Sequence, residues 1–229
     1  MATYKCVVEP FARVFVTIVD ELKAYPQDKA ASLAAETLTP SELDIWTSMP
    51  AQKTRRLEWL LGRVALKEAV CEWMLETELK RIDNQDIVIT RTQAGAPQVV
   101  WSDERVGNLP VISLAHSTGV IVAAVAGAAA VGVDVECASR QAPTVARVLT
   151  AVETELLNSD QITLLSAVVA KEAASKAVGL GLGGDLRRWP IVHGDQKQHF
   201  VTCVDDPELQ LVVDLLAVPE LVLGVCVVI

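Results

Sequence analysis

The chain has 229 residues, with 20 Lys and Arg against 29 Asp and Glu, so its formal net charge is −9. Half of the residues are apolar (51%), which excludes an intrinsically disordered chain, and the ordinary numbers of Gly and Pro exclude a collagen-like one. The acidic balance argues against a general nucleic-acid-binding protein, because such a protein needs a basic footprint. Either one large domain or two domains of about 100 residues fits this length.

The cysteines and the apolar segments indicate the compartment. The five cysteines are widely spread and form no CxxC or CxH pair, so we expect neither a zinc site nor a disulfide framework. The N-terminus lacks the charged-then-apolar pattern of a signal peptide. The longest apolar stretch, Val120–Val133, is about 14 residues and too short to span a bilayer. We therefore expect a cytoplasmic protein without a membrane partner.

The N-terminal half is predicted to contain a strand, two helices and two short strands. Thr39 is a capping residue, Pro40 occupies the first helical position, and Glu42 stands three residues after the cap, which together indicate a helix start. The next helix is rich in Leu, Ala, Glu, Lys and Arg and contains no proline. The predicted elements are a strand at Ala12–Val19, a helix from Pro40 to about Ser48, a helix at Gln52–Leu79, and strands at Asp86–Thr90 and Pro97–Trp101 around a Gly-Ala-Pro turn.

The C-terminal half repeats this type of order. Its first strands are almost continuously apolar, as expected of strands that are covered on both faces. The glycine-rich run Gly179–Gly184 ends the long helix, and Asp206-Pro207 and Pro219-Glu220 mark turns. The predicted elements are strands at Val111–Ala115, Val120–Ala126 and Ala130–Glu136, helices at Val152–Leu157 and Ile162–Val178, and strands at Phe200–Val204, Leu209–Leu216 and Leu221–Val228.

The two long helices share a short sequence match. Val64–Ala69 reads VALKEA and Val168–Ala173 reads VVAKEA, although Lys-Glu-Ala is common in helices. Together with the order of elements, the match predicts an α+β protein of two pseudo-symmetric halves, residues 1–110 and 111–229. Each half is expected to be a long helix packed on a small, mostly antiparallel sheet.

Two carboxylates stand at the end of an apolar strand, in Gly132-Val133-Asp134-Val135-Glu136. Alternate side chains of a strand share a face, so Asp134 and Glu136 point the same way. Paired carboxylates at such a position suit a hard cation. A strand that simply emerges into solvent explains the same pattern equally well.

Three further groups have both a functional and an ordinary interpretation. Glu172 and Lys176 are four residues apart on a predicted helix, which fits a site or an exposed ion pair. His116 follows a buried strand and is either a ligand contact or a structural histidine. Arg56 and Arg63 share one helix face with Lys67, so this face either grips phosphates or is merely solvated.

Taken together, these motifs resemble one family. The order Ala115-His116-Ser117, then GVDVE, then KEAASK, preceded by RRLEWLLGR on a helix, resembles the 4′-phosphopantetheinyl transferases of the surfactin-synthetase-activating type. The segment KEAASKAVGLGLGG is also similar to domains at the carboxyl end of polyketide-synthase-like multienzymes. Val168 stands where the family usually has Trp, and Ala96 stands where a cation often helps to hold coenzyme A.

The resemblance implies a function and a site between the two halves. It implies Mg²⁺-dependent transfer of 4′-phosphopantetheine from coenzyme A to a serine of an acyl or peptidyl carrier protein, with release of 3′,5′-ADP, as in polyketide or fatty acid biosynthesis. Mn²⁺ is an alternative cation, the carrier protein is expected to be acidic, and the enzyme is expected to be a monomer. The implied metal ligands are Asp134, Glu136 and Glu172; the implied catalytic residues are Asp134, Glu172 and Lys176; and the implied coenzyme A contacts are Arg56, Arg63, His116, Ser117, Lys171 and Lys176.

Two alternatives to an active transferase remain. A degenerate domain of this family could dock carrier proteins without catalysis, and an unrelated α+β binding module could do the same. For the transferase, the expected docking surface for the carrier protein is the Gly179–Gly184 loop, with Leu180 and Leu182 exposed beside Lys176 and followed by Arg187 and Arg188; the two leucines could instead fill the core.

Overall fold

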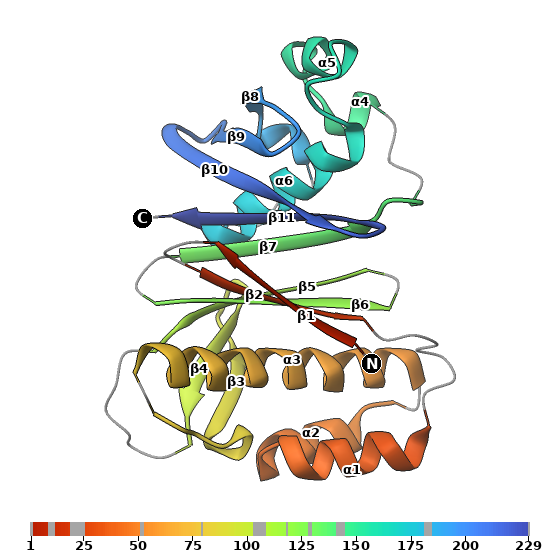
Figure 1. The fold of residues 1–229 in the computed structure, drawn as a ribbon, viewed down its shortest axis with the longest axis vertical. Coiled ribbons are helices and arrows are strands. Elements are labelled where there is room, and N and C mark those ends of the chain that lie inside the picture. Colours follow the sequence, from red (N-terminus) through yellow and green to blue (C-terminus); the bar gives the residue numbers. More distant parts are fainter. Residues whose placement is uncertain are drawn as a thin grey trace. The chain divides into compact units, whose positions relative to one another are not determined.

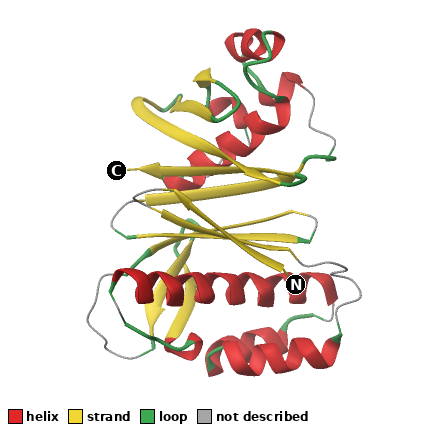
Figure 2. Cartoon of the chain, viewed as in Figure 1, coloured by secondary structure: helices red, strands yellow, loops and turns green. Residues whose placement is uncertain are grey.

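The computed structural model describes residues 2–8, 12–18, 26–50, 53–78, 80–102, 109–117, 119–127, 130–140, 145–180 and 185–228. Over these ranges the protein is α+β, as the sequence predicts (Figure 2). It divides into two compact units, residues 1–114 with 119–128 and residues 115–118 with 129–229. The sequence predicts a single boundary after residue 110, whereas the chain passes between these units more than once. None of the described helices is long and apolar enough to cross a membrane.

In its described residues, the first unit consists of a sheet, three α-helices and a hairpin. The sheet has the strand order β1-β2-β6-β5, in which β2 pairs antiparallel with both β1 and β6. In Figure 1, α3 lies between this sheet and the pair formed by α1 and α2. The elements are β1 (Ala2–Val8), β2 (Ala12–Ile18), α1 (Gln27–Thr37), α2 (Pro40–Ser48), α3 (Lys53–Thr77), the 3₁₀ helix Asn84–Asp86, β3 (Ile87–Arg91), β4 (Pro97–Trp101), β5 (Val111–Ser117, whose last residues belong to the second unit) and β6 (Val120–Ala126).

The burial of α3 follows from its position between two layers. Apolar residues recur every three or four positions along α3 and form one buried row. A second buried row on the same helix contacts α1 and α2. The capping box of α2 forms as predicted, because Thr39 Oγ1 accepts from the Glu42 N–H while the Glu42 carboxylate accepts from the Thr39 N–H. The buried positions of α3 are Leu57, Leu60, Leu61, Val64, Ala65, Leu66, Lys67, Ala69, Val70, Trp73 and Met74.

The described part of the second unit is a five-stranded antiparallel sheet with three α-helices. Its strand order is β7-β11-β10-β9-β8, and α6 lies against β7 and β11. Alanines of α6 form much of the core, and their small side chains permit a close approach of helix and sheet. The elements are β7 (Ala130–Cys137), α4 (Val145–Val148), α5 (Ala151–Asn158), α6 (Leu164–Ala177), the 3₁₀ helix Leu186–Arg188, β8 (Ile191–Gly194), β9 (Gln198–Cys203), β10 (Asp206–Val218) and β11 (Leu221–Val228).

Relative to the sequence prediction, the structure adds two 3₁₀ helices and four other elements and moves one turn. The sequence does not predict β1, α1, α4 or β8. The α1 helix has no side-chain cap at Pro26 and few apolar positions, so its local signal is weak. The predicted turn at Asp206-Pro207 is wrong by two residues, since β10 already begins at Asp206. Its register breaks between Asp206 and Gln210, which accommodates a proline that cannot donate to the ladder.

Candidate functional site

Strand β7 carries the paired carboxylates on the face that helix α6 covers, within the second unit. Gly132, Asp134 and Glu136 alternate along β7 and therefore share the face that α6 covers. A Cβ atom at position 132 would lie 2.0 Å from the carbonyl oxygen of Ala173. The glycine of the GVDVE motif thus permits α6 to approach closely enough for Lys176 to reach Asp134.

Asp134 is buried and pairs with the partly exposed Lys176, and one Asp134 oxygen has no partner among the described residues. Lys176 Nζ donates to Asp134 Oδ1 over 2.6 Å and to the Val133 carbonyl over 3.1 Å. Asp134 Oδ2 is buried and has no hydrogen-bond partner among the described residues. Burial raises the pKa of Asp134 to about 6, Lys176 partly offsets this shift, and the negative charge of Glu172 raises the pKa further. An orphaned oxygen of this kind suits a cation or a hydrogen-bond donor from a ligand.

Glu136 is bound by two groups of the same unit. Ser117 Oγ donates to Glu136 Oε2 over 2.6 Å, and Arg140 forms an ion pair with Glu136 Oε1. Ser117 is therefore beside a predicted metal ligand, while the adjacent His116 side chain is exposed. The arginine was missed by the sequence analysis, although its position four residues after Glu136 was a usable signal.

The predicted metal set is only partly assembled. In the described part of the chain, no group of three or more His, Cys, Asp or Glu side chains is placed to hold a metal ion. The donors that are present are nevertheless carboxylate oxygens, and one of them is orphaned. This chemistry fits Mg²⁺ or Mn²⁺ if Asp134 and Glu136 exchange their cationic partners, Lys176 and Arg140, for the ion, with Glu172 as a third carboxylate.

Lys171, a predicted coenzyme A contact, lies in the interior of the second unit. Its side chain is completely buried, Nζ is 2.6 Å from Glu153 Oε1, and it donates to the Val148 carbonyl over 2.7 Å. Glu153 also accepts from the Ile191 N–H and closes the capping box of α5 with Thr150. Lys171 is thus held by structural partners, and we omit it from the proposed binding set.

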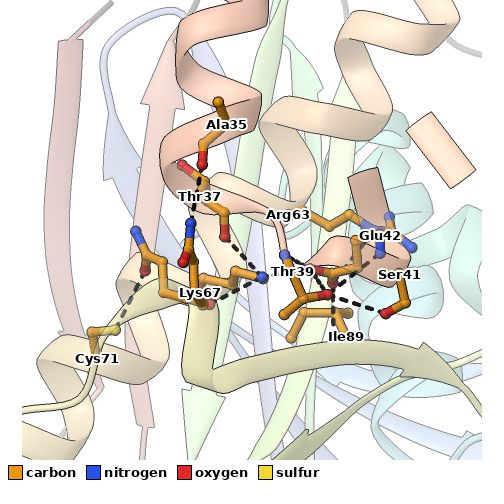
Figure 3. A network of polar contacts seen from close by, with 11 residues as sticks. Ala35, Thr37, Thr39, Ser41, Glu42, Arg63, Lys67, Cys71 and Ile89 are labelled. Atoms are coloured by element: carbon orange, nitrogen blue, oxygen red, sulfur yellow. Dashed lines mark hydrogen bonds and ion pairs between the residues drawn. The ribbon is translucent and has the colours of Figure 1, made fainter. Parts of the chain in front are cut away.

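The first unit contains the same arrangement around Lys67, shown in Figure 3. Lys67 Nζ is fully buried, contacts Glu42 Oε2 at 2.5 Å and donates to the Thr37 carbonyl over 2.9 Å. Glu42 accepts from the Ile89 N–H, as Glu153 does from Ile191. The VALKEA and VVAKEA match therefore marks equivalent buried lysines. The sequence analysis did not identify their two glutamate partners as equivalent. A Thr-x-x-Glu capping box in each half would have indicated this equivalence.

Arg56 and Arg63 lie on α3 in the first unit, each against an aromatic ring. The Arg56 guanidinium is 4.0 Å from the centroid of Trp46, and that of Arg63 is 3.3 Å from the centroid of Trp59. The Nε atoms of both arginines are buried without a hydrogen-bond partner among the described residues. The predicted basic face is therefore partly buried.

The glycine-rich run is described only at its start. Val178 caps α6, and Gly179 has a φ of 71°, a left-handed conformation that ends the helix as predicted. The Leu180 side chain is 61% exposed, and Leu182 lies outside the described residues.

A comparison with known protein families matches most of the second unit. Residues 130–226 match the family model of the 4′-phosphopantetheinyl transferase superfamily. This segment begins with β7 and contains α6, so it includes every residue of the second unit discussed above except Ser117 and His116. It confirms the expected class of enzyme, a 4′-phosphopantetheinyl transferase, at the level of the superfamily for this part of the chain. No curated protein sequence matches the chain.

Solved structures of holo-acyl-carrier-protein synthases are similar to about half of the chain. The holo-ACP synthase of Plasmodium yoelii is 16% identical, covers 56% of this chain and 97% of its own, and gives a TM-score of 0.42. The holo-acyl-carrier-protein synthase of Thermotoga maritima is 27% identical, with coverages of 52% and 67% and a TM-score of 0.37. That of Helicobacter pylori, in complex with coenzyme A, is 22% identical, with coverages of 51% and 99% and a TM-score of 0.37. Because these TM-scores lie below 0.5, the assignment rests on the family model.

Proposed function

We propose that this chain transfers 4′-phosphopantetheine from coenzyme A to a serine of an acyl or peptidyl carrier protein, in the manner of the surfactin-synthetase-activating type. The observation that carries the proposal is the ion pair between the buried Asp134 and the partly exposed Lys176, in which one carboxylate oxygen has no partner among the described residues. It lies in the segment that matches the superfamily. The contacts of Lys171 with Glu153 and the Val148 carbonyl account for its burial. Asp134 Oδ2, in contrast, has no partner among the described residues that would account for its burial.

In the proposed reaction the serine oxygen forms a bond to the phosphorus that carries pantetheine. The bond from this phosphorus to the oxygen of the 3′,5′-ADP phosphate breaks, and the electron pair leaves with 3′,5′-ADP. Glu172 is half-buried on α6 and takes the serine proton, either directly or through a water molecule. Lys176, four residues later on the same helix, stabilises the charge that develops on the departing phosphate.

Asp134, Glu136 and Glu172 would hold the Mg²⁺ or Mn²⁺ ion, with Asp134 Oδ2 as the donor that is already free. Bound there, the ion would neutralise and polarise the pyrophosphate. Ser117 keeps the Glu136 carboxylate in place. Arg140 is its other partner and must move when Glu136 takes up a cation.

The decisive experiment is mass spectrometry of several apo carrier proteins after incubation with coenzyme A and Mg²⁺. We expect the mass to increase by one phosphopantetheine, with no increase in EDTA. Asp134→Asn keeps the shape of the side chain and removes its charge, so we expect it to lower the rate by at least about 100-fold. Glu155→Gln, on the exposed side of α5, is the matched control and should react at the wild-type rate.

Cation binding provides a second measurement that does not depend on turnover. Titration with Mn²⁺, followed by electron paramagnetic resonance, should show a site that Asp134→Asn weakens and Glu155→Gln leaves intact. Carrier proteins that bind tightly without any gain in mass would instead establish the non-catalytic docking domain. Full turnover in EDTA would contradict the metal assignment.

A further inference from the structure

Both oxygens of the Glu136 carboxylate are engaged within the second unit. Ser117 Oγ donates to Oε2 over 2.6 Å, and the Arg140 guanidinium forms an ion pair with Oε1. Asp134 differs, because Lys176 contacts its Oδ1 while its Oδ2 has no partner among the described residues. Asp134 therefore has a free oxygen to offer to a cation, whereas Glu136 must first give up a partner.

A tight turn brings Arg140 back to the end of β7. The Arg140 N–H donates to the Cys137 carbonyl over 2.9 Å, which closes a four-residue turn directly after the strand. The Ala138 N–H donates to the Glu220 carbonyl over 2.9 Å, so the turn between β10 and β11 anchors this segment. The backbone thus places Arg140 beside Glu136, four residues earlier in the chain.

The two partners of Glu136 differ in how easily they can leave. Ser117 belongs to β5 and is buried, so its hydroxyl is held beside the carboxylate. The Arg140 side chain is 55% exposed, whereas that of Glu136 is only 10% exposed. A half-exposed arginine can turn into solvent and regain its hydration at little cost. Arg140 is therefore the partner that can be displaced.

A divalent cation and a guanidinium exclude each other at one carboxylate oxygen. Two cations so close together repel strongly where solvent is partly excluded. The Ser117 hydroxyl is neutral, so it can hold Oε2 whichever cation is bound at Oε1. A buried carboxylate without a partner is costly, so Arg140 stabilises Glu136 until another cation takes its place.

We propose that Arg140 is a built-in competitor of the divalent cation at Glu136, and that Ser117 is the positioning residue that keeps this carboxylate aimed at the site. The inference rests on the proposed function, because that function requires the cation. It gives the two partners of one side chain opposite effects, since Arg140 weakens cation binding and Ser117 strengthens it. The family resemblance, in contrast, implies that Ser117 contacts coenzyme A.

The first test is a titration with Mn²⁺ alone, followed by electron paramagnetic resonance. Arg140→Gln removes the competing charge and should lower the Kd for Mn²⁺ about threefold to fivefold, because a half-exposed ion pair no longer has to be broken. Arg147→Gln removes the same charge at an exposed position of the same unit and should leave this Kd unchanged. An unchanged or higher Kd in Arg140→Gln would overturn the competition.

The second test concerns the opposite effect of Ser117. Ser117→Ala leaves Glu136 without its fixed donor and should raise the Kd for Mn²⁺ about tenfold. Ser117→Thr keeps the hydroxyl and should restore most of the affinity. A Ser117→Ala protein with unchanged Mn²⁺ affinity and weakened coenzyme A binding would overturn the positioning role and make Ser117 a coenzyme A contact.

Thermal unfolding separates competition from a purely structural role of Arg140. Without Mn²⁺, Arg140→Gln should lower the melting temperature, because the buried Glu136 loses its cationic partner. In saturating Mn²⁺ the loss should be smaller, because the bound ion replaces the guanidinium. A loss of the same size under both conditions would show that Arg140 only stabilises the fold and would overturn the proposal.

These measurements also distinguish this inference from the proposed function. Mn²⁺ binding that is tightened by Arg140→Gln, without any transfer to carrier proteins, would overturn the proposed function and leave the competition standing. Mg²⁺-dependent transfer by a protein whose Mn²⁺ affinity is indifferent to Arg140 would do the reverse.

Discussion

The two units contain the same buried lysine–glutamate pair, but the charged groups beside this pair differ. In each, a Thr-x-x-Glu capping box starts a short helix, and the glutamate receives a buried lysine from the long helix and an N–H from an isoleucine of a strand. Beside this buried pair, the first unit has arginines that lie against tryptophan rings. The second unit has Asp134 in an ion pair with Lys176. The shared parts stabilise the fold, whereas the parts that differ have unsatisfied atoms.

This comparison teaches that a motif lysine must be judged by its burial. Lys171 and Lys176 stand in the same motif and carry the same charge. Lys171 is fully buried with a structural partner that recurs in the first unit, whereas the Lys176 side chain is 31% exposed. A repeated buried pair indicates a structural role, and its unrepeated neighbour remains the candidate for function.

The largest expected effect comes from breaking the buried lysine–glutamate pair of either unit. Lys67→Met and Lys171→Met each leave a buried glutamate without its cation, which should cost about 3–5 kcal/mol of unfolding free energy. Urea denaturation measures the loss, and hydrogen exchange shows which unit loses protection. Lys80→Met and Lys197→Met, at exposed lysines of the two units, are controls that should change little. A Lys171→Met protein of wild-type stability with weakened coenzyme A binding would return Lys171 to the ligand contacts.

A second expected effect distinguishes the glycines of the two units. Gly132→Ala should destabilise the protein by about 1–3 kcal/mol or more, because its Cβ would meet the backbone oxygen of Ala173 at 2.0 Å. Gly62→Ala on α3 is the comparison, since its Cβ meets only a Leu114 side-chain carbon at 3.1 Å and alanine favours the helix. Thermal unfolding of both variants should give a clear loss for Gly132 and almost none for Gly62. Equal losses would show that β7 and α6 tolerate separation.

A third, smaller effect tests whether the two caps are equivalent. Thr39→Ala and Thr150→Ala should each cost about 1 kcal/mol, because each removes the hydroxyl that accepts from the N–H of the glutamate. The matched Thr→Ser variants keep the hydroxyl and should recover most of the stability. The measurement is the urea midpoint at constant m-value. A difference of several kcal/mol between the two alanine variants would contradict the equivalence.

The smallest effect is a pH dependence that belongs to the second unit. His199 is fully buried, its Nε2 lies 2.8 Å from Ser166 Oγ at the start of α6, and its Nδ1 lies 2.9 Å from the Gln198 carbonyl. Burial lowers the pKa of His199 below its usual 6.5, and the Gln198 carbonyl and Asp195 partly offset this. The unfolded state therefore binds the proton more readily, so this stability is complete above about pH 6.5 and falls as the pH drops through the folded pKa.

We expect this titration to contribute a slope of at most about 1.4 kcal/mol per pH unit. Unfolding free energies measured from pH 7.5 to pH 5 should show it in the wild type and lose it in His199→Gln. His193→Gln, at an exposed histidine in the same unit, is the control and should retain the slope. A slope that survives in His199→Gln would assign the pH dependence to another group.

Local signals were sufficient for most of the elements. The Thr39-Pro40-Glu42 start, the glycine stop at Gly179 and the apolar runs of β6 and β7 act through contacts between near neighbours, so the sequence by itself determined them. Short-range patterns also indicated that Asp134 and Glu136 share a face. The elements that the sequence missed, such as α1 and β8, have weak local signals and depend on packing within the unit.

Only the tertiary structure decided which charged side chains are buried and what they contact. The sequence could not show that Glu42 pairs with Lys67, or Glu153 with Lys171, because each pair joins residues far apart in the chain. Desolvation depends on everything that surrounds a side chain, so two lysines of one motif can differ completely in their environment while their sequence context remains nearly the same.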